Sequence, residues 1–100
     1  MVDCYLYDHQ RTPRGLGKSN GKLHAFTPVS LLARLLVRLK QRSNFDSTEI
    51  DDVIIGCVEP HVEQGGNIAR AAILLAGYHQ QVPGMQLNRF CASGLDSAAL

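Results

Sequence analysis

The chain lacks the sequence features of membrane-spanning, secreted and disulfide-bonded proteins. None of its apolar runs approaches the roughly 18 residues needed to span a bilayer. Residues 1–4 offer no basic stretch followed by an apolar one, which argues against a secretory leader. The three cysteines, Cys4, Cys57 and Cys91, are odd in number and widely spaced, as in reduced cytosolic proteins. We therefore expect a cytoplasmic protein with no membrane span.

An excess of charge of either sign is also absent. The formal net charge is +1, so nothing attracts the chain strongly to nucleic acid or to an anionic membrane. A hydrophobic fraction of 45% and a charged fraction of 19% are typical of a globular domain and not of a disordered chain. We therefore expect a folded protein without a nucleic-acid partner.

Glycine-rich and histidine-containing stretches do not match cofactor or metal motifs. The segment Gly15–Ser19 is similar to part of a phosphate-binding loop, but Thr12 stands where that loop requires its first glycine. The four histidines are scattered without the spacing of metal ligands, and the cysteines form no zinc pattern. We expect neither a metal site nor a bound cofactor.

Hydrophobic periodicity alternates along the chain between strand and helix. We expect a strand over Val2–Tyr7, a long loop over residues 9–26, and a helix that begins at Thr27–Pro28, where Thr27 can serve as the cap. The later elements are a strand buried on both faces over Val53–Val58, a helix over Ile68–Ala76 between Asn67 and Gly77, a strand over Met85–Arg89 and a helix from Cys91 onward. This alternation favours an α/β fold with a largely parallel sheet.

The strongest candidate for chemistry is Cys91, at the expected junction of the last strand and helix. The first amides of a helix lack internal partners, and together with the helix dipole they favour a thiolate at that end. Those amides could also hold the oxyanion that forms when a thiolate attacks an acyl carbonyl. A buried cysteine that only packs a tight turn fits the same geometry equally well. Cys4 and Cys57 lie inside expected strands, where cysteines act as small hydrophobic residues.

The residues around Cys91 closely resemble the nucleophile motif of the thiolase family. Residues 88–95 are Asn-Arg-Phe-Cys-Ala-Ser-Gly-Leu. Three further stretches are similar to thiolase segments in the same order: Arg11-Thr12-Pro13 with Gly15 and residues 21–23, the strand at residues 53–58, and residues 64–70 (Gln-Gly-Gly-Asn-Ile-Ala-Arg). The resemblance therefore covers almost the whole chain.

The resemblance implies an acyl-CoA acyltransferase with Cys91 as its catalytic residue. Thiolases cleave or form β-ketoacyl-CoA, such as acetoacetyl-CoA, through an S-acyl-cysteine intermediate. Their fold is a layered pair of α/β halves, they are dimers or tetramers, and CoA thioesters are substrates of enzymes that need no cofactor. By this resemblance the Cys91 amide contributes to the oxyanion hole, Ser93 and Gly94 shape the turn, and Asn88 and Arg89 fix the strand end and a subunit contact.

The same resemblance implies that residues 1–100 are the N-terminal part of the thiolase N-terminal domain. The activating histidine and the second acid/base cysteine of the family lie beyond residue 100, so we expect no turnover from these residues alone. Asp96 stands where many thiolases carry glutamine, and its role is open. Two alternatives remain: a β-ketoacyl synthase-like condensing enzyme, and a non-catalytic interaction module.

Overall fold

The computed structural model describes residues 2–100, and its longest helix begins where the sequence predicts. Helix α1 spans Pro28–Ser43. The Thr27 side chain accepts a hydrogen bond from the Ser30 amide at 3.2 Å, and Pro28 occupies the first position, where no amide hydrogen is required. The helix ends at Asn44, which adopts the left-handed conformation with φ of 50°. These local signals confirm the expected helix and its cap.

Two short strands form a parallel sheet, and a helix lies in the connection between them. Strand β1 spans Val53–Gly56 and strand β2 spans Gly84–Leu87, with Val53 opposite Gly84. Parallel strands need a long crossover connection, which contains helix α2 at Ile68–Leu75. The α/β fold with a parallel sheet is confirmed.

Both ends of α2 match the sequence signals. At its start, the Asn67 side chain accepts a hydrogen bond from the Arg70 amide. At its end Gly77 has φ of 77°, which glycine adopts without strain. The Gly77 and Tyr78 amides then donate to the carbonyls of Leu74 and Ile73. This pair of bonds is a Schellman motif, and it satisfies two carbonyls that the helix end leaves free.

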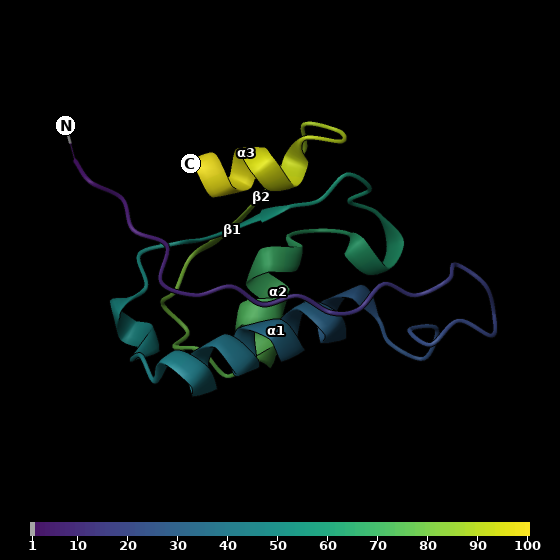
Figure 1. Cartoon of the computed structure of the whole chain (residues 1–100), viewed down its shortest axis with the longest axis horizontal. Coiled ribbons are helices and arrows are strands. Elements are labelled where there is room, and N and C mark those ends of the chain that lie inside the picture. Colours follow the sequence, from purple (N-terminus) through teal and green to yellow (C-terminus); the bar gives the residue numbers. More distant parts are fainter. Residues whose placement is uncertain (1) are drawn as a thin grey trace.

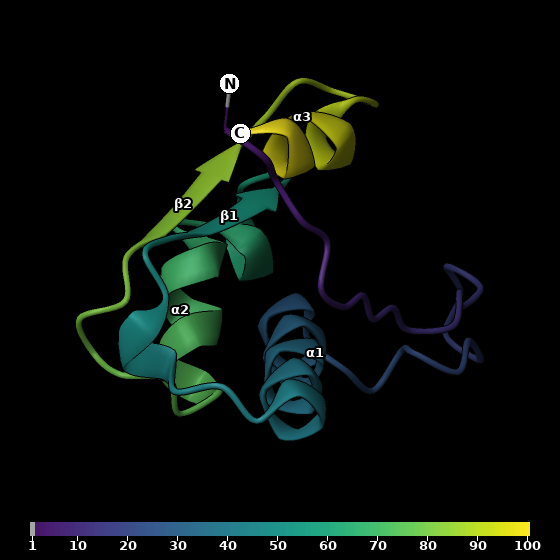
Figure 2. The ribbon, with the colours of Figure 1, turned by 60° about the vertical axis from the view of Figure 1, so that its left-hand side comes forward.

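The helices cover the sheet on both faces. Helix α3, which spans Ser93–Ala99, lies against β1 on one face, while α2 lies against both strands on the other and α1 packs against α2 (Figures 1 and 2). Single turns of 3-10 helix at Ser47–Glu49 and Val62–Gln64 lie in the connections. The result is a layered arrangement in which α3 is separated from α1 and α2 by the sheet.

A small apolar core lies between α1, α2 and the connection that follows α2. Its buried members are Leu36, Ala72, Ile73, Tyr78 and Val82. Within it, the Tyr78 hydroxyl donates a hydrogen bond of 2.7 Å to the Leu36 carbonyl. Helix α2 can approach β2 closely because Gly84 has no side chain: a methyl group there would lie 2.7 Å from the Arg70 amide nitrogen. The core thus holds α1 against α2, while α2 itself lies against the sheet.

The strand expected over Val2–Tyr7 is not present, and this prediction is wrong. The segment has no strand partner among the described residues, and Val2 and Tyr7 are 94% and 92% exposed. Strand preference is realised only where a neighbour supplies hydrogen bonds, and here the segment runs outside the sheet (Figure 1). The expected strand over Val53–Val58 is also shorter, and its residues are half-buried and not buried on both faces.

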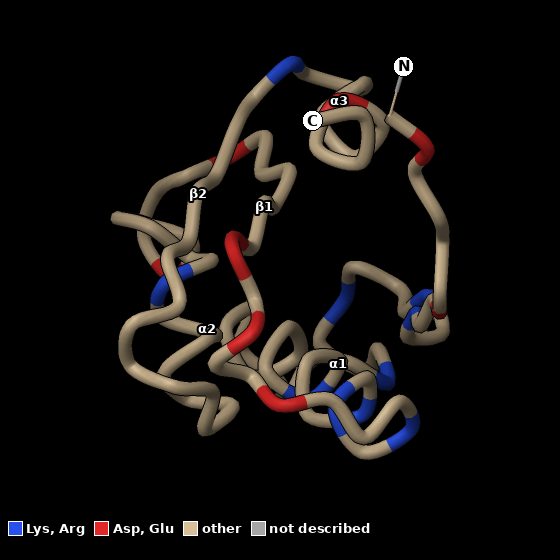
Figure 3. Tube along the Cα trace, turned by 90° about the vertical axis from the view of Figure 1, so that its left-hand side faces the viewer, with Lys and Arg blue, Asp and Glu red and all other residues tan. Residues whose placement is uncertain are grey.

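Charge is segregated along the fold. Positively charged residues are concentrated on α1 and on the loop before it, and negatively charged ones follow in the connections around β1 (Figure 3). Lys40 and Arg42 lie in the last turn of α1, where cations complement the helix dipole. Arg42 also pairs with Asp8 at 3.4 Å, which ties the N-terminal segment to the end of α1.

Replacing Tyr78 with phenylalanine tests the core hydrogen bond. We expect Tyr78→Phe to lower the free energy of unfolding by about 0.5–1.5 kcal/mol, the usual net value of one such bond. Burial raises the pKa of Tyr78 above its ordinary value of 10.0. The pKa of Tyr78 is therefore higher in the folded state than in the unfolded state. The contribution of the neutral Tyr78 hydroxyl to stability is complete below the unfolded-state pKa and is lost as the pH rises through the folded-state pKa.

Chemical denaturation at neutral pH and again above pH 10.0 measures both effects. Tyr7→Phe is the matched control, because Tyr7 is 92% exposed and should lose no stability. Equal stability of Tyr78→Phe and the unchanged protein would contradict this role of the hydroxyl.

Candidate active site

Cys91 lies in a loop, residues 88–92, between the end of β2 and the start of α3. Because β1 and β2 are parallel, their carboxyl ends meet at one edge of the sheet, and the Cys57 amide extends the pairing by donating to the Leu87 carbonyl at 2.9 Å. The loops that follow the two strands therefore lie on the same side of the molecule (Figure 1). Cys91 itself is exposed. Cys91 is therefore accessible, on a loop that begins where β2 leaves the sheet.

Asn88 joins the Cys91 loop to the chain after β1. Its side-chain amide donates to the Val58 carbonyl at 3.0 Å, and its side-chain oxygen accepts from the Phe90 amide at 2.8 Å. One side chain thus fixes both the strand end and the residue that precedes Cys91. The expectation that Asn88 fixes the strand end is confirmed, while its part in a subunit contact stays a prediction.

Ser93, the first residue of α3, is buried and bonds back to the loop. Only 3% of this residue is exposed. Its hydroxyl accepts from the Arg89 amide at 2.9 Å and donates to the Phe90 carbonyl at 2.7 Å. Phe90 has φ of 50°, an uncommon conformation for a residue with a side chain, and the bonds from Asn88 and Ser93 hold it there. The role of Ser93 in shaping the turn is confirmed.

The start of α3 touches β1 directly at Gly56. A methyl group on Gly56 would lie 2.5 Å from the Ser93 carbonyl carbon, which is too close for any side chain. By contrast, a methyl group on Gly94 would meet nothing within 4 Å, and Gly94 does not have a positive φ. The contact between β1 and α3 therefore requires Gly56, which sequence reasoning missed. The turn does not require a glycine at position 94, contrary to expectation.

The position of Cys91 relative to the helix differs from the prediction. Helix α3 begins at Ser93, two residues after Cys91, and is only seven residues long. The amides of Ala92 and Ser93 donate to the carbonyls of Arg89 and Phe90 at 3.1 and 3.0 Å. These two amides are therefore occupied, because the left-handed Phe90 forms a tight turn before the helix starts. That the amide of Cys91 itself donates to an oxyanion stays a prediction.

The other two cysteines lie in different surroundings. Cys57 is buried just after β1, with its sulfur 3.5 Å from the Gln64 side-chain oxygen, as expected of a small buried residue. Cys4 is exposed and lies outside any strand, so the expectation that it is buried in a strand is wrong. Cys91 therefore differs from Cys57 because it is exposed. It differs from Cys4 because side-chain hydrogen bonds from Asn88 and Ser93 hold its loop.

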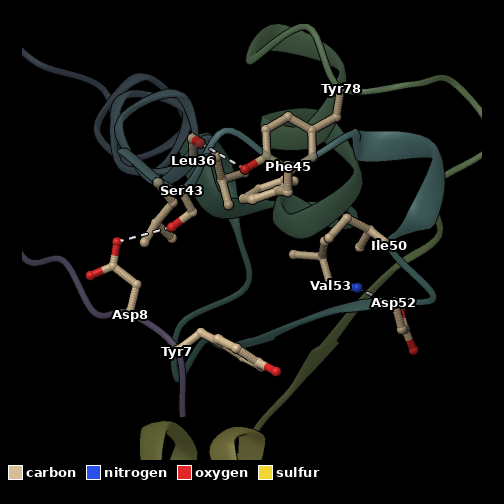
Figure 4. A pocket seen from close by; sticks show the side chains of 10 residues that line it. Tyr7, Asp8, Leu36, Ser43, Phe45, Ile50, Asp52, Val53 and Tyr78 are labelled. Atoms are coloured by element: carbon tan, nitrogen blue, oxygen red, sulfur yellow. Dashed lines mark hydrogen bonds between the residues drawn. The ribbon is translucent and has the colours of Figure 1, made fainter. Parts of the chain in front are cut away.

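An apolar hollow of about 540 Å³ lies on the opposite side of the sheet from α3, under the N-terminal segment (Figure 4). Tyr7 overhangs it, and Asp8 accepts a hydrogen bond of 3.2 Å from the Ser43 hydroxyl at its rim. The rest of its lining is Leu36, Leu39, Phe45, Ile50, Asp52, Val53 and Tyr78. None of these residues belongs to the Cys91 loop, so the hollow is not part of the candidate site.

Within residues 2–100 no group of three His, Cys, Asp or Glu side chains is placed to hold a metal ion. The helices of this part of the chain are all too short or too polar to cross a membrane.

Comparison with known proteins gives one consistent result. The model of the thiolase N-terminal domain matches residues 4–100. A steroid 3-ketoacyl-CoA thiolase of Mycobacterium tuberculosis is 42% identical over 93 residues, which are 93% of this chain and 22% of that protein. A beta-ketoadipyl-CoA thiolase of Pseudomonas aeruginosa is 40% identical over 95% of this chain and 23% of its own length. A 3-ketoacyl-CoA thiolase of Bacillus subtilis is 39% identical over 99% of this chain and 25% of its own length. The chain thus spans about a quarter of the length of these curated relatives.

A methyl group at position 56 tests the contact between β1 and α3. We expect Gly56→Ala to lower the free energy of unfolding by about 1–3 kcal/mol, because backbone atoms must move to admit the methyl group. Denaturant titration measures this loss. Gly17→Ala is the control, since a methyl group there meets nothing within 4 Å. A loss for Gly56→Ala no larger than that of Gly17→Ala would contradict the close contact.

Proposed function

The chain belongs to the thiolase family, and from this we infer that it forms part of an acyl-CoA acyltransferase in which Cys91 accepts the acyl group. The observation that carries this proposal is that Cys91 is exposed, while hydrogen bonds from Ser93 and Asn88 hold the backbone of its loop in place. Covalent catalysis requires this combination, since the nucleophile must reach the substrate while its backbone stays in place.

In the proposed reaction the Cys91 thiolate attacks the carbonyl carbon of an acyl-CoA thioester. The bond from sulfur to the acyl carbon forms, the thiolate of CoA leaves, and the acyl group stays on Cys91. This order applies to condensation, in which a second step transfers the acyl group to the enolate of acetyl-CoA. In cleavage the thiolate instead attacks the β-keto carbonyl of β-ketoacyl-CoA, the bond between the α and β carbons breaks, and acetyl-CoA leaves as its enolate and takes up a proton. The second step of cleavage then transfers the acyl group from Cys91 to CoA. The Cys91 amide would donate to the oxyanion of each tetrahedral intermediate. The chain's own residues hold the nucleophile, and proton transfer is assigned to groups outside residues 1–100.

The substrates that we propose are CoA thioesters of β-keto acids, without a metal or prosthetic group. Relatives that are named for 3-ketoacyl-CoA and beta-ketoadipyl-CoA support this class, as does the match of the thiolase N-terminal domain. We further propose a cytoplasmic homodimer or homotetramer. The match to thiolases also favours this reading over a β-ketoacyl synthase or a non-catalytic interaction module.

Selective alkylation tests whether Cys91 is the nucleophile. In the intact enzyme we expect iodoacetamide to modify Cys91 faster than Cys4, although both are exposed in the structure, and to modify buried Cys57 most slowly. Mass mapping of the modified peptides over time gives the three rates. Because Cys4 controls for exposure, a Cys91 rate no higher than that of Cys4 would count against an activated thiol.

Replacement of the nucleophile tests the reaction itself. We expect Cys91→Ser to lower kcat for acetoacetyl-CoA thiolysis by more than about a thousandfold, because a hydroxyl near neutral pH is a far weaker nucleophile than a thiolate. Loss of acetoacetyl-CoA absorbance measures the rate, and Cys4→Ser is the control with unchanged activity. Activity of Cys91→Ser within tenfold of the unchanged enzyme would refute the assignment.

Residues 1–100 alone should show no thiolysis. The proposed proton-transfer groups lie outside them, and apolar side chains of α2 and α3 such as Leu74, Leu75 and Leu95 are more than half exposed, so self-association is expected. Sedimentation together with the same thiolysis assay tests both points. A monomer with measurable turnover would overturn this prediction.

A further inference from the structure

The last thirty residues carry two formal charges, and these two pair with each other. Within residues 71–100, Arg89 is the one Lys or Arg and Asp96 is the one Asp or Glu. The Arg89 Nε atom lies 2.8 Å from an Asp96 carboxylate oxygen, the distance of a charge-assisted hydrogen bond. Cys91 lies between them, two residues after Arg89 and five before Asp96.

The pair joins the Cys91 loop to the first turn of α3. Arg89 lies in the loop, where its amide donates to Ser93 and its carbonyl accepts from Ala92. Asp96 lies in the first turn of α3, and its amide donates to the Ala92 carbonyl. The ion pair adds a link between two charged side chains to the bonds that the Ser93 hydroxyl already makes to the Arg89 amide and the Phe90 carbonyl. It therefore restrains the same six-residue stretch, residues 90–95, that contains Cys91.

We propose that Arg89 and Asp96 form a clamp that positions Cys91 for acylation, an inference that rests on the proposed function. Arg89 and Asp96 are positioning residues, because they act through the loop and contact no substrate in the proposal. No other charged residue of the described chain is paired with either of them, so each depends on its partner.

The expected size of the effect follows from exposure. The two side chains are 71% and 35% exposed, so solvent and salt screen their attraction, and exposed pairs contribute little to overall stability. The clamp should therefore change how often the loop holds its reactive arrangement, and not whether the domain folds. Asp96 also raises the pKa of Arg89, through the hydrogen bond and its negative charge, although an arginine guanidinium is charged at any working pH without this shift.

A plainer role for Asp96 predicts a different outcome. A carboxylate in the first turn of a helix is stabilising by itself, because it complements the helix dipole. That role needs no partner, so it would make Asp96→Asn deleterious while Arg89→Gln would be neutral. The clamp requires that either substitution have the same effect, and that the double variant be no worse than either single one.

The test measures the single-turnover acylation rate of Cys91 by acetoacetyl-CoA in the intact enzyme. We expect Asp96→Asn and Arg89→Gln each to slow acylation about two- to fivefold at low salt, with the double variant equal to the single ones. High salt should slow the unchanged enzyme to the rate of the variants. The exchange of charges, Arg89→Asp with Asp96→Arg, should restore part of the rate, and the midpoint of denaturant unfolding should not move.

Three outcomes would overturn the clamp: single variants as fast as the unchanged enzyme, additive losses in the double variant, or an effect of Asp96→Asn alone. Each of these leaves acylation of Cys91 detectable, and so leaves the proposed function intact. Absence of any acyl-enzyme in the unchanged protein, by contrast, would remove the proposed function itself. The two failures are therefore distinguishable in one experiment.

Discussion

Parallel pairing of β1 with β2 is the constraint on which the rest of the structure depends. It requires a crossover, which places α2 on one face, and it brings the carboxyl ends of both strands to one edge. Cys57 and Leu87 extend the pairing to that edge by a backbone hydrogen bond. The loops that leave the strands are then close enough for Asn88 to bond to the Val58 carbonyl. The candidate nucleophile is thus presented by the sheet and not by a helix alone.

Close approach of backbones makes this arrangement possible. Gly56 lets the start of α3 touch β1, and Gly84 lets α2 lie against β2. Both glycines lie in strands, where a side chain would force the layers apart. The two helices therefore lie close to opposite faces of a sheet of only two strands, and small residues set the spacing. The distance between each helix and the sheet is thus set by the absence of a side chain at Gly56 and at Gly84.

The Cys91 loop combines a buried support with an exposed reactive atom. The Asn88 side-chain oxygen accepts from the Phe90 amide, and the Ser93 hydroxyl donates to the Phe90 carbonyl, so the two side chains hold the uncommon conformation of Phe90. On the outer side, Arg89 and Asp96 add a weaker, salt-sensitive restraint. Neutral hydrogen bonds from Ser93 and Asn88 determine the shape of the loop, whereas the exposed ion pair can only adjust it. This division is consistent with a nucleophile whose sulfur must stay free to meet substrate.

The sequence by itself determined the features that depend on neighbouring residues: the caps at Thr27 and Asn67, the helix end at Gly77, and the motif around Cys91. Their hydrogen bonds join residues a few positions apart, so their residue types suffice to predict them. Only the tertiary structure decided the rest. Residues 2–7 form no strand, because a strand needs a partner that composition cannot supply. The need for Gly56 and the start of α3 after Cys91 follow from contacts between segments far apart in the chain, whose distances no local pattern encodes.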